Sequence, residues 1–223
     1  MTGTNAFIKS NNNNNIPTNP STDYYIGWDV GQAKDYSALC VLQRNGLGYQ
    51  VRHLERRPLD QSYPRQVEHL FQMWHRKPLV QANKLLAIDY TGVGRPVYDL
   101  VLDRGLAPVI GISITGGDSV NWLDDRKRAR VPKRDLVSLL QVYAQNNRLK
   151  VAQNLRYGPV LADELQSFKV KIDPRTAHDS YGSWREGEYD DFILSLAVAL
   201  WAAENHNSQT HAVFRHVSRV RAY

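Results

Sequence analysis

The chain has 223 residues, 42% of them hydrophobic, which suffices for one well-buried domain with extensions. Its 28 lysines and arginines outnumber its 22 aspartates and glutamates, and the net charge of +6 favours a polyanionic partner. The single cysteine, Cys40, excludes an internal disulfide and lies in the apolar run ALCVL, which favours a place in the core. No apolar run approaches the roughly 18 residues of a membrane span, and no signal-peptide core opens the chain. We therefore expect no membrane partner.

The N-terminal part of the chain predicts an antiparallel meander after a polar arm. Residues 1–22 are polar and Asn-rich and are expected to form a disordered arm. Segments 24–30, 36–44 and 49–57 are rich in aromatic and β-branched residues and are separated by the turn signals GQAKD and NGLG. Three short strands in this arrangement are typical of a meander.

The middle of the chain alternates between helical and extended patterns. Segment 62–77 carries apolar residues at helical spacing, and 84–90 is a short apolar run expected to be a buried strand. A helix is predicted at 94–105, where it stops at Gly105, and a further strand at 107–115.

The second half continues with three predicted helices. They are expected from Pro132 onward, at 158–168 and at 188–203, with a short strand at 148–152 and strand-forming pieces at 168–187. This order fits an α/β sandwich of the ribonuclease H type, with helices on both faces of a mixed sheet. The sheet would combine the three antiparallel meander strands with parallel strands. We expect one domain at 23–205 and a basic tail at 206–223.

Aspartates end two of the predicted strands, and two more begin the last helix. Asp29 and Asp89 follow apolar runs whose strands can lie side by side in a right-handed crossover topology. An unpaired buried carboxylate costs several kcal/mol, so such an acid needs a cation or strong hydrogen bonds. A turn-forming role is the alternative for each.

The pair Asp190 and Asp191 has a simple explanation as helix capping, because Asp is favoured at an N-cap and at the positive end of the helix dipole. However, if the last helix packs against the sheet, one of the pair faces the same edge as Asp29 and Asp89. Small residues such as Ser195 would permit that close approach. Carboxylate clusters select hard divalent cations, so we expect Mg²⁺ or Mn²⁺.

Three spaced motifs carry a resemblance to a known family. GWDVGQAKDYSALCVL, IDYTGVGRPVYDLV and EYDDFILSLAVAL resemble the nuclease domain of large terminase subunits of tailed phages, over about residues 24–204. VPKRDLVSLLQVYAQNNRLKV is similar to the family's segment between the second and third motifs. The resemblance implies a ribonuclease H-like fold and metal-dependent endonucleolytic cleavage of DNA during genome packaging.

Carried over by motif, the resemblance implies that Asp29, Asp89 and Asp191 are the catalytic, metal-binding acids, with Asp190 as an auxiliary ligand. This chain has Tyr189 where the family often has His, and Leu194 where a further acid often follows. It contains no G-x-x-x-x-G-K-[ST], so we expect either an excised nuclease domain or a stand-alone relative that cuts without pumping. The resemblance implies a separate or excised ATPase domain and a portal protein as further partners. The expected location is the cytoplasm of a bacterial host.

A basic segment, RKRARVPKR at 126–134, is the candidate surface for double-stranded DNA. A solvated face is the alternative explanation of such a charge run. Arg95, in the Gly-rich turn TGVGRP, is a further candidate for phosphate contact, and Trp122 is expected to anchor the basic loop. The candidate DNA-binding residues are Arg95, Arg126, Lys127, Arg128, Arg130, Lys133 and Arg134.

Together these features predict a DNA endonuclease that uses two-metal phosphodiester hydrolysis. Asp29 would bridge both ions, and Asp89 and Asp191 would each hold one. A Holliday-junction resolvase-like nuclease, which requires a dimer, remains an alternative. A non-catalytic DNA-binding packaging module is another. A sugar-kinase or actin-type ATPase also begins with a D-x-G turn, but it normally needs two such domains.

Overall fold

The computed structural model describes residues 23–31, 35–171 and 190–220. At residues 125, 167–171 and 206–220 it describes the backbone only. An eight-stranded sheet has the order β6-β7-β5-β4-β1-β2-β3-β8. Its strands are β1 (Asp23–Asp29), β2 (Ala38–Asn45), β3 (Gly48–Arg56), β4 (Asn83–Asp89), β5 (Val109–Thr115), β6 (Asn121–Leu123), β7 (Arg128–Pro132) and β8 (Leu149–Val151). The helices are α1 (Tyr63–Trp74), α2 (Gly94–Asp103), α3 (Lys133–Gln145), α4 (Gly158–Lys171) and α5 (Asp191–Val220), with short 3₁₀ turns at Leu79–Gln81 and Asp124–Arg126.

The strand pairing is that of a mixed sheet. β1, β2 and β3 form an antiparallel meander, and β4 joins the other side of β1 in parallel. β5 and β7 extend the parallel part, while β8 pairs with β3 in parallel and β6 returns antiparallel to β7. The predicted ribonuclease H-like α/β fold is confirmed, including the meander and the adjacency of β1 and β4.

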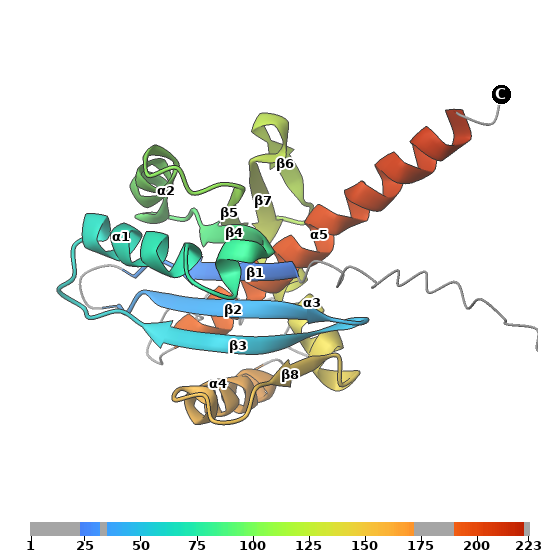
Figure 1. Cartoon of the computed structure of the whole chain (residues 1–223). Helices are drawn as coiled ribbons and strands as arrows, with labels where there is room; N and C mark the ends of the chain where they lie inside the picture. Colours follow the sequence, from blue (N-terminus) through green and yellow to red (C-terminus); the bar gives the residue numbers. More distant parts are fainter. Residues whose placement is uncertain (1–22, 32–34, 172–189, 221–223) are drawn as a thin grey trace, which may run out of the picture.

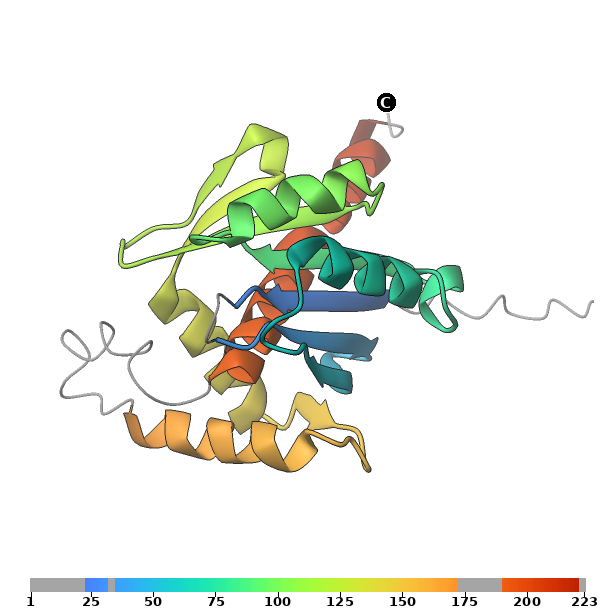
Figure 2. The same ribbon diagram turned by 90° about the vertical axis from the view of Figure 1, so that its left-hand side faces the viewer.

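Helices cover both faces of this sheet (Figures 1 and 2). Residues alternate along each strand, so one face of β1 presents Tyr24, Ile26 and Trp28 to a core shared with α1 and α2. The other face presents Tyr25 to a core shared with α3, α4 and α5. The sheet is thus the middle layer of a three-layer sandwich, as its runs of buried residues require.

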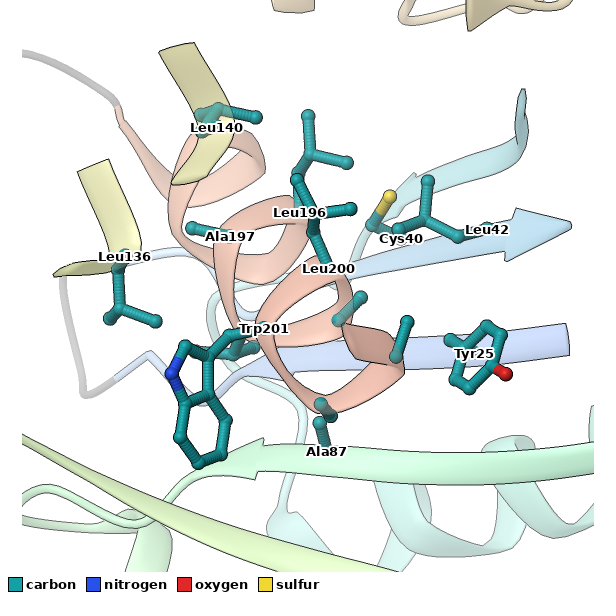
Figure 3. Packing of buried hydrophobic residues seen from close by; sticks show 14 of the residues in the cluster. Tyr25, Cys40, Leu42, Ala87, Leu136, Leu140, Leu196, Ala197, Leu200 and Trp201 are labelled. Carbon is teal, nitrogen blue, oxygen red and sulfur yellow. The ribbon is translucent and has the colours of Figure 1, made fainter. Parts of the chain in front are cut away.

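Helix α5 lies closely against the centre of the sheet (Figure 3). A Cβ atom added to Gly27 would lie 1.8 Å from the backbone oxygen of Ser195 and 2.9 Å from Cβ of Ala199. The small residues predicted to allow a close approach therefore lie where the helix crosses β1. Cys40 is fully buried in the same cluster, as expected for a core residue, and burial raises the pKa of its thiol.

The structure adds two strands in the basic region that the sequence reading did not assign. β7 alternates Arg128 and Arg130 with the buried Ala129 and Val131, a period of two that was available in the sequence. The strong positive charge of this segment masks the short alternation in the sequence.

The C-terminal third differs from expectation in its boundaries. Residues 168–171 belong to helix α4 rather than to the predicted strand pieces, and the rest of 168–187 lies outside the described residues. α5 continues to Val220, through most of the segment assigned to a basic tail. The arm at 1–22 also lies outside the described residues, and the domain boundaries stay predictions.

None of the described helices is long and apolar enough to cross a membrane.

Candidate active site

Asp29 and Asp89 end two adjacent parallel strands. β1 and β4 pair with Trp28 opposite Ile88, so the next residues of both strands, the two aspartates, are neighbours at the carboxyl edge of the sheet. Because side chains alternate, both lie on the face of Gly27 that α5 covers. Asp89 is only 3% exposed and accepts a 2.9 Å hydrogen bond from the backbone N–H of Thr91, whereas Asp29 is half-buried. The predicted juxtaposition of these strand ends is therefore present.

Helix α5 brings Asp191 to the same edge. Ser195, one turn into the helix, lies on Gly27, which is two residues before Asp29. Asp191 is the first helical residue and is 8% exposed. The backbone carbonyl of Asp190 accepts a 3.0 Å hydrogen bond from the N–H of Leu194, which places Asp190 at the N-cap position. The two aspartates thus have different positions, one at the cap and one in the first turn.

Two further residues, Arg56 and Glu164, complete the surroundings of Asp191, and the sequence reading missed both. A guanidinium N–H of Arg56 donates a 2.8 Å hydrogen bond to Glu164, and its Nε lies 3.2 Å from Oδ2 of Asp191. The other oxygen of Glu164 accepts a 3.1 Å hydrogen bond from the N–H of Ile193 in the first turn of α5. A carboxylate from α4 therefore caps α5. An available signal was that Glu164 lies three residues after the apolar Leu161, on the inward face of its helix.

Burial makes both acids beside Arg56 easier to protonate than free carboxyl groups. Burial raises the pKa of Asp191 to about 6, with Arg56 acting in the opposite direction and Asp35 adding to the rise. Burial likewise raises the pKa of Glu164 to about 7, against the lowering by Ile193 and Arg56 and with the support of Asp191 and Asp190. Asp35 itself is exposed. The ionised form of both acids is therefore disfavoured here, and a nearby positive charge would favour it.

The acids at this edge are oxygen donors of the kind that Mg²⁺ and Mn²⁺ prefer in proteins. Oδ2 of Asp191 is buried and, despite the nearby Nε of Arg56, accepts no hydrogen bond from the described residues. A carboxylate oxygen in that condition fits a hard cation. Within the described ranges, no group of three or more Asp, Glu, His or Cys side chains is gathered closely enough to hold a metal ion.

The predicted DNA-binding residues are spread over β7 and its flanking segments and the start of α2. Arg126 and Lys127 are exposed at the turn between β6 and β7, and Arg130 is exposed on β7. Lys133 and Arg134 open α3, where Arg134 pairs with Asp118 at 2.7 Å. Arg95 and Arg128 both contact Tyr90. The ring of Trp122 lies 5.2 Å from that of Trp201 on α5, so this residue anchors the hairpin as expected.

Comparison with solved structures places this arrangement among known folds. The large terminase nuclease of thermophilic phage G20c superimposes with a TM-score of 0.51 at 20% identity, over 81% of this chain and 82% of that one. The human cytomegalovirus terminase nuclease domain superimposes with a TM-score of 0.53 at 10% identity, over 82% of this chain and 85% of that one. The fold is that of terminase nuclease domains. Neither a protein-family model nor a curated protein sequence matches the chain.

The terminase nuclease fold accounts for only part of some longer neighbours. The large terminase of another thermophilic bacteriophage matches with a TM-score of 0.54 at 9% identity, over 80% of this chain but 39% of that one. That longer phage terminase has been solved in complex with ATP-γ-S and with ADP, and the cytomegalovirus domain has been solved after soaking with Mn.

Proposed function

We propose that this protein is a metal-dependent DNA endonuclease that cuts DNA during viral genome packaging, in the manner of terminase nucleases. The observation that carries the proposal is the arrangement of Asp29, Asp89 and Asp191, which come from three distant parts of the chain to one edge and one face of the sheet. The terminase nuclease fold and the Mn soaking of the cytomegalovirus domain support it.

In this proposal Asp29, Asp89 and Asp191 hold two divalent ions, Mg²⁺ or Mn²⁺, with Asp190 as an auxiliary ligand. When bound, such ions supply an activated water and stabilise the charge that develops on the leaving 3′ oxygen. The chain's own residues prepare the acids for this task. The N–H of Thr91 orients Asp89, while Arg56 and Glu164 hold Asp191 at the start of α5.

The basic residues bind the phosphate backbone and supply affinity without reading sequence. They are Arg95, Arg126, Lys127, Arg128, Arg130, Lys133 and Arg134. We also propose that a terminase ATPase, as a separate chain or domain, and a portal protein work with this nuclease in the host cytoplasm. The nucleotide complexes of the longer phage terminase support the ATPase part.

A plasmid-nicking assay with Mg²⁺, Mn²⁺ or EDTA tests the proposed activity. Asp29→Asn, Asp89→Asn and Asp191→Asn should each abolish cutting and leave the circular dichroism spectrum unchanged. Asp190→Asn should be milder, because adjacent helical residues project about 100° apart. Asp103→Asn, an exposed position at the end of α2, is the matched control. Cutting in EDTA, or wild-type cutting by Asp89→Asn, would contradict the proposal.

A further inference from the structure

Two arginines from different elements meet at the hydroxyl group of Tyr90. Nε of Arg95 donates a hydrogen bond of 3.2 Å to this oxygen, and a terminal N–H of Arg128 donates one of 2.9 Å. Both guanidinium groups also lie over the tyrosine ring, at 5.5 Å and 5.3 Å from its centroid. Two cations that share one neutral acceptor lie close together, and this arrangement costs electrostatic energy unless an anion joins them.

The tyrosine at the centre of this group is held in place. Its ring packs edge-on against Tyr98 with the centroids 5.3 Å apart, and it fills the space beside Gly111, where an added Cβ would come within 2.9 Å of it. Tyr90 directly follows Asp89, so the two side chains lie on opposite faces of the same sheet edge. The arginine pair is therefore adjacent to the acids but separated from them by the end of β4.

The charges around the pair favour an incoming anion. Arg95 lies in the first turn of α2, where the helix dipole disfavours a cation, and that turn has neither a side-chain cap nor an acidic residue. Among the described residues, Asp124 is the carboxylate that forms an ion pair with the group, through Arg128. One negative charge against two positive ones leaves the group cationic.

We propose that Arg95 and Arg128 bind a single backbone phosphate of the DNA, and that Tyr90 is the positioning residue that holds them together. This proposal rests on the proposed nuclease function and specifies how the substrate strand is held beside the acids. Arginine suits this role because its planar guanidinium presents several donors to phosphate oxygens. From the sequence the two arginines were separate candidates, and the structure joins them into one site.

Duplex binding in EDTA, measured by fluorescence anisotropy over a range of NaCl concentrations, tests the shared site without cleavage. Each neutralised phosphate contributes about 0.9 to the log–log salt slope. The double variant Arg95→Gln/Arg128→Gln should therefore lower the slope by about 0.9. A decrease of about 1.8 would mean two independent contacts, and no decrease would mean none; either result overturns the proposal.

The role of Tyr90 is tested by Tyr90→Phe, which keeps the ring and its packing. Binding should weaken several-fold in the wild-type background and stay unchanged in the double arginine variant. Equal weakening in both backgrounds would show a structural effect only and would overturn the positioning role. Arg104→Gln, at the other end of α2 and paired with Glu68 at 2.9 Å, is the control and should leave the slope unchanged.

Failure of this proposal is distinguishable from failure of the nuclease function. Binding in EDTA does not depend on catalysis. If the double arginine variant lowers the salt slope although the wild type never cuts DNA, the phosphate site is supported and only the nuclease function fails. Conversely, acid-dependent cutting with an unchanged slope would overturn the phosphate site alone.

Discussion

Two carboxylates of this protein, Glu55 and Asp191, have pKa values shifted in opposite directions, because they differ in how many cationic partners oppose the effect of burial. Burial acts to raise the pKa of Glu55, but hydrogen bonds from His53, His69 and Arg57 outweigh it and lower that pKa to about 2. Asp191 has Arg56 beside it, and its pKa is raised to about 6. The protein itself supplies several cationic partners to Glu55, whereas Asp191 is the carboxylate that we propose to bind a metal ion.

This difference predicts a pH-dependent stability for Glu55. Its folded pKa of about 2 lies below the ordinary value of 4.5, so ionised Glu55 stabilises the fold. That contribution is fully present above pH 4.5 and is lost as the pH falls toward 2. The pKa shift corresponds to about 3 kcal/mol at most. Because solvent screens these partly exposed ion pairs, Glu55→Gln should lower the free energy of unfolding at pH 7 by about 2–3 kcal/mol.

Urea unfolding of wild type and Glu55→Gln between pH 7 and pH 3.5 measures this effect. The difference in unfolding free energy between the two proteins should become smaller as the pH falls. The exposed Glu68, which pairs with Arg104, offers Glu68→Gln as a control with little change at any pH. A gap that stays constant across this range would show that the lost stability comes from packing rather than from charge.

At the scale of elements, the contact between α5 and β1 determines where Asp191 lies. Gly27→Ala would place a methyl group 1.8 Å from the backbone of Ser195, and backbone cannot rotate away as a side chain can. The free energy of unfolding should fall by about 1–3 kcal/mol or more, which is the usual cost of adding atoms to a well-packed core. It should also lose nicking activity, because the helix that carries Asp191 must shift. Thermal unfolding and the nicking assay together measure both effects.

Gly116→Ala is the matched control for this substitution, because an added Cβ there meets no atom within 4 Å. It should melt within about 2 °C of wild type, in line with surface substitutions generally. Unchanged stability of Gly27→Ala would mean that α5 does not pack on β1 as described.

The turn between β6 and β7 carries a separate prediction about DNA. Arg126 and Lys127 are exposed there, so replacing both with Gln should weaken binding to unrelated duplexes equally. Each lost phosphate contact should reduce the log–log salt slope by about 0.9. Anisotropy titrations at several NaCl concentrations measure the slope, and an unchanged slope would identify this turn as a solvated face.

At the scale of the whole molecule, local patterns predicted the parts of the site that lie on strands. Apolar runs ending in Asp29 and Asp89 placed both acids at strand ends, and the crossover rule placed the strands side by side. Small residues on the last helix indicated its close approach. These signals are local because strand alternation and helical spacing are properties of short segments.

The remaining features depend on tertiary packing that short segments do not encode. Arg56 meets Glu164 and Asp191 only because α4 and α5 pack beside the end of β3. Tyr90 gathers Arg95 and Arg128 only because β7 lies next to β5, which a charge-rich segment did not indicate. Sequence reasoning therefore placed Asp29 and Asp89 at neighbouring strand ends but indicated neither the contacts of Arg56 and Glu164 nor the pairing of the two arginines.

The central claim is that the acidic edge binds a divalent cation, and the melting temperature in EDTA and in Mn²⁺ tests it most directly. At ten times its dissociation constant, a bound ion adds about 1.4 kcal/mol, a rise of about 3–6 °C for a domain of this size. Wild type should show this rise, and Asp89→Asn should melt at or above wild type in EDTA but gain much less from Mn²⁺. An unmoved wild type, or an equal gain in both proteins, would contradict the account.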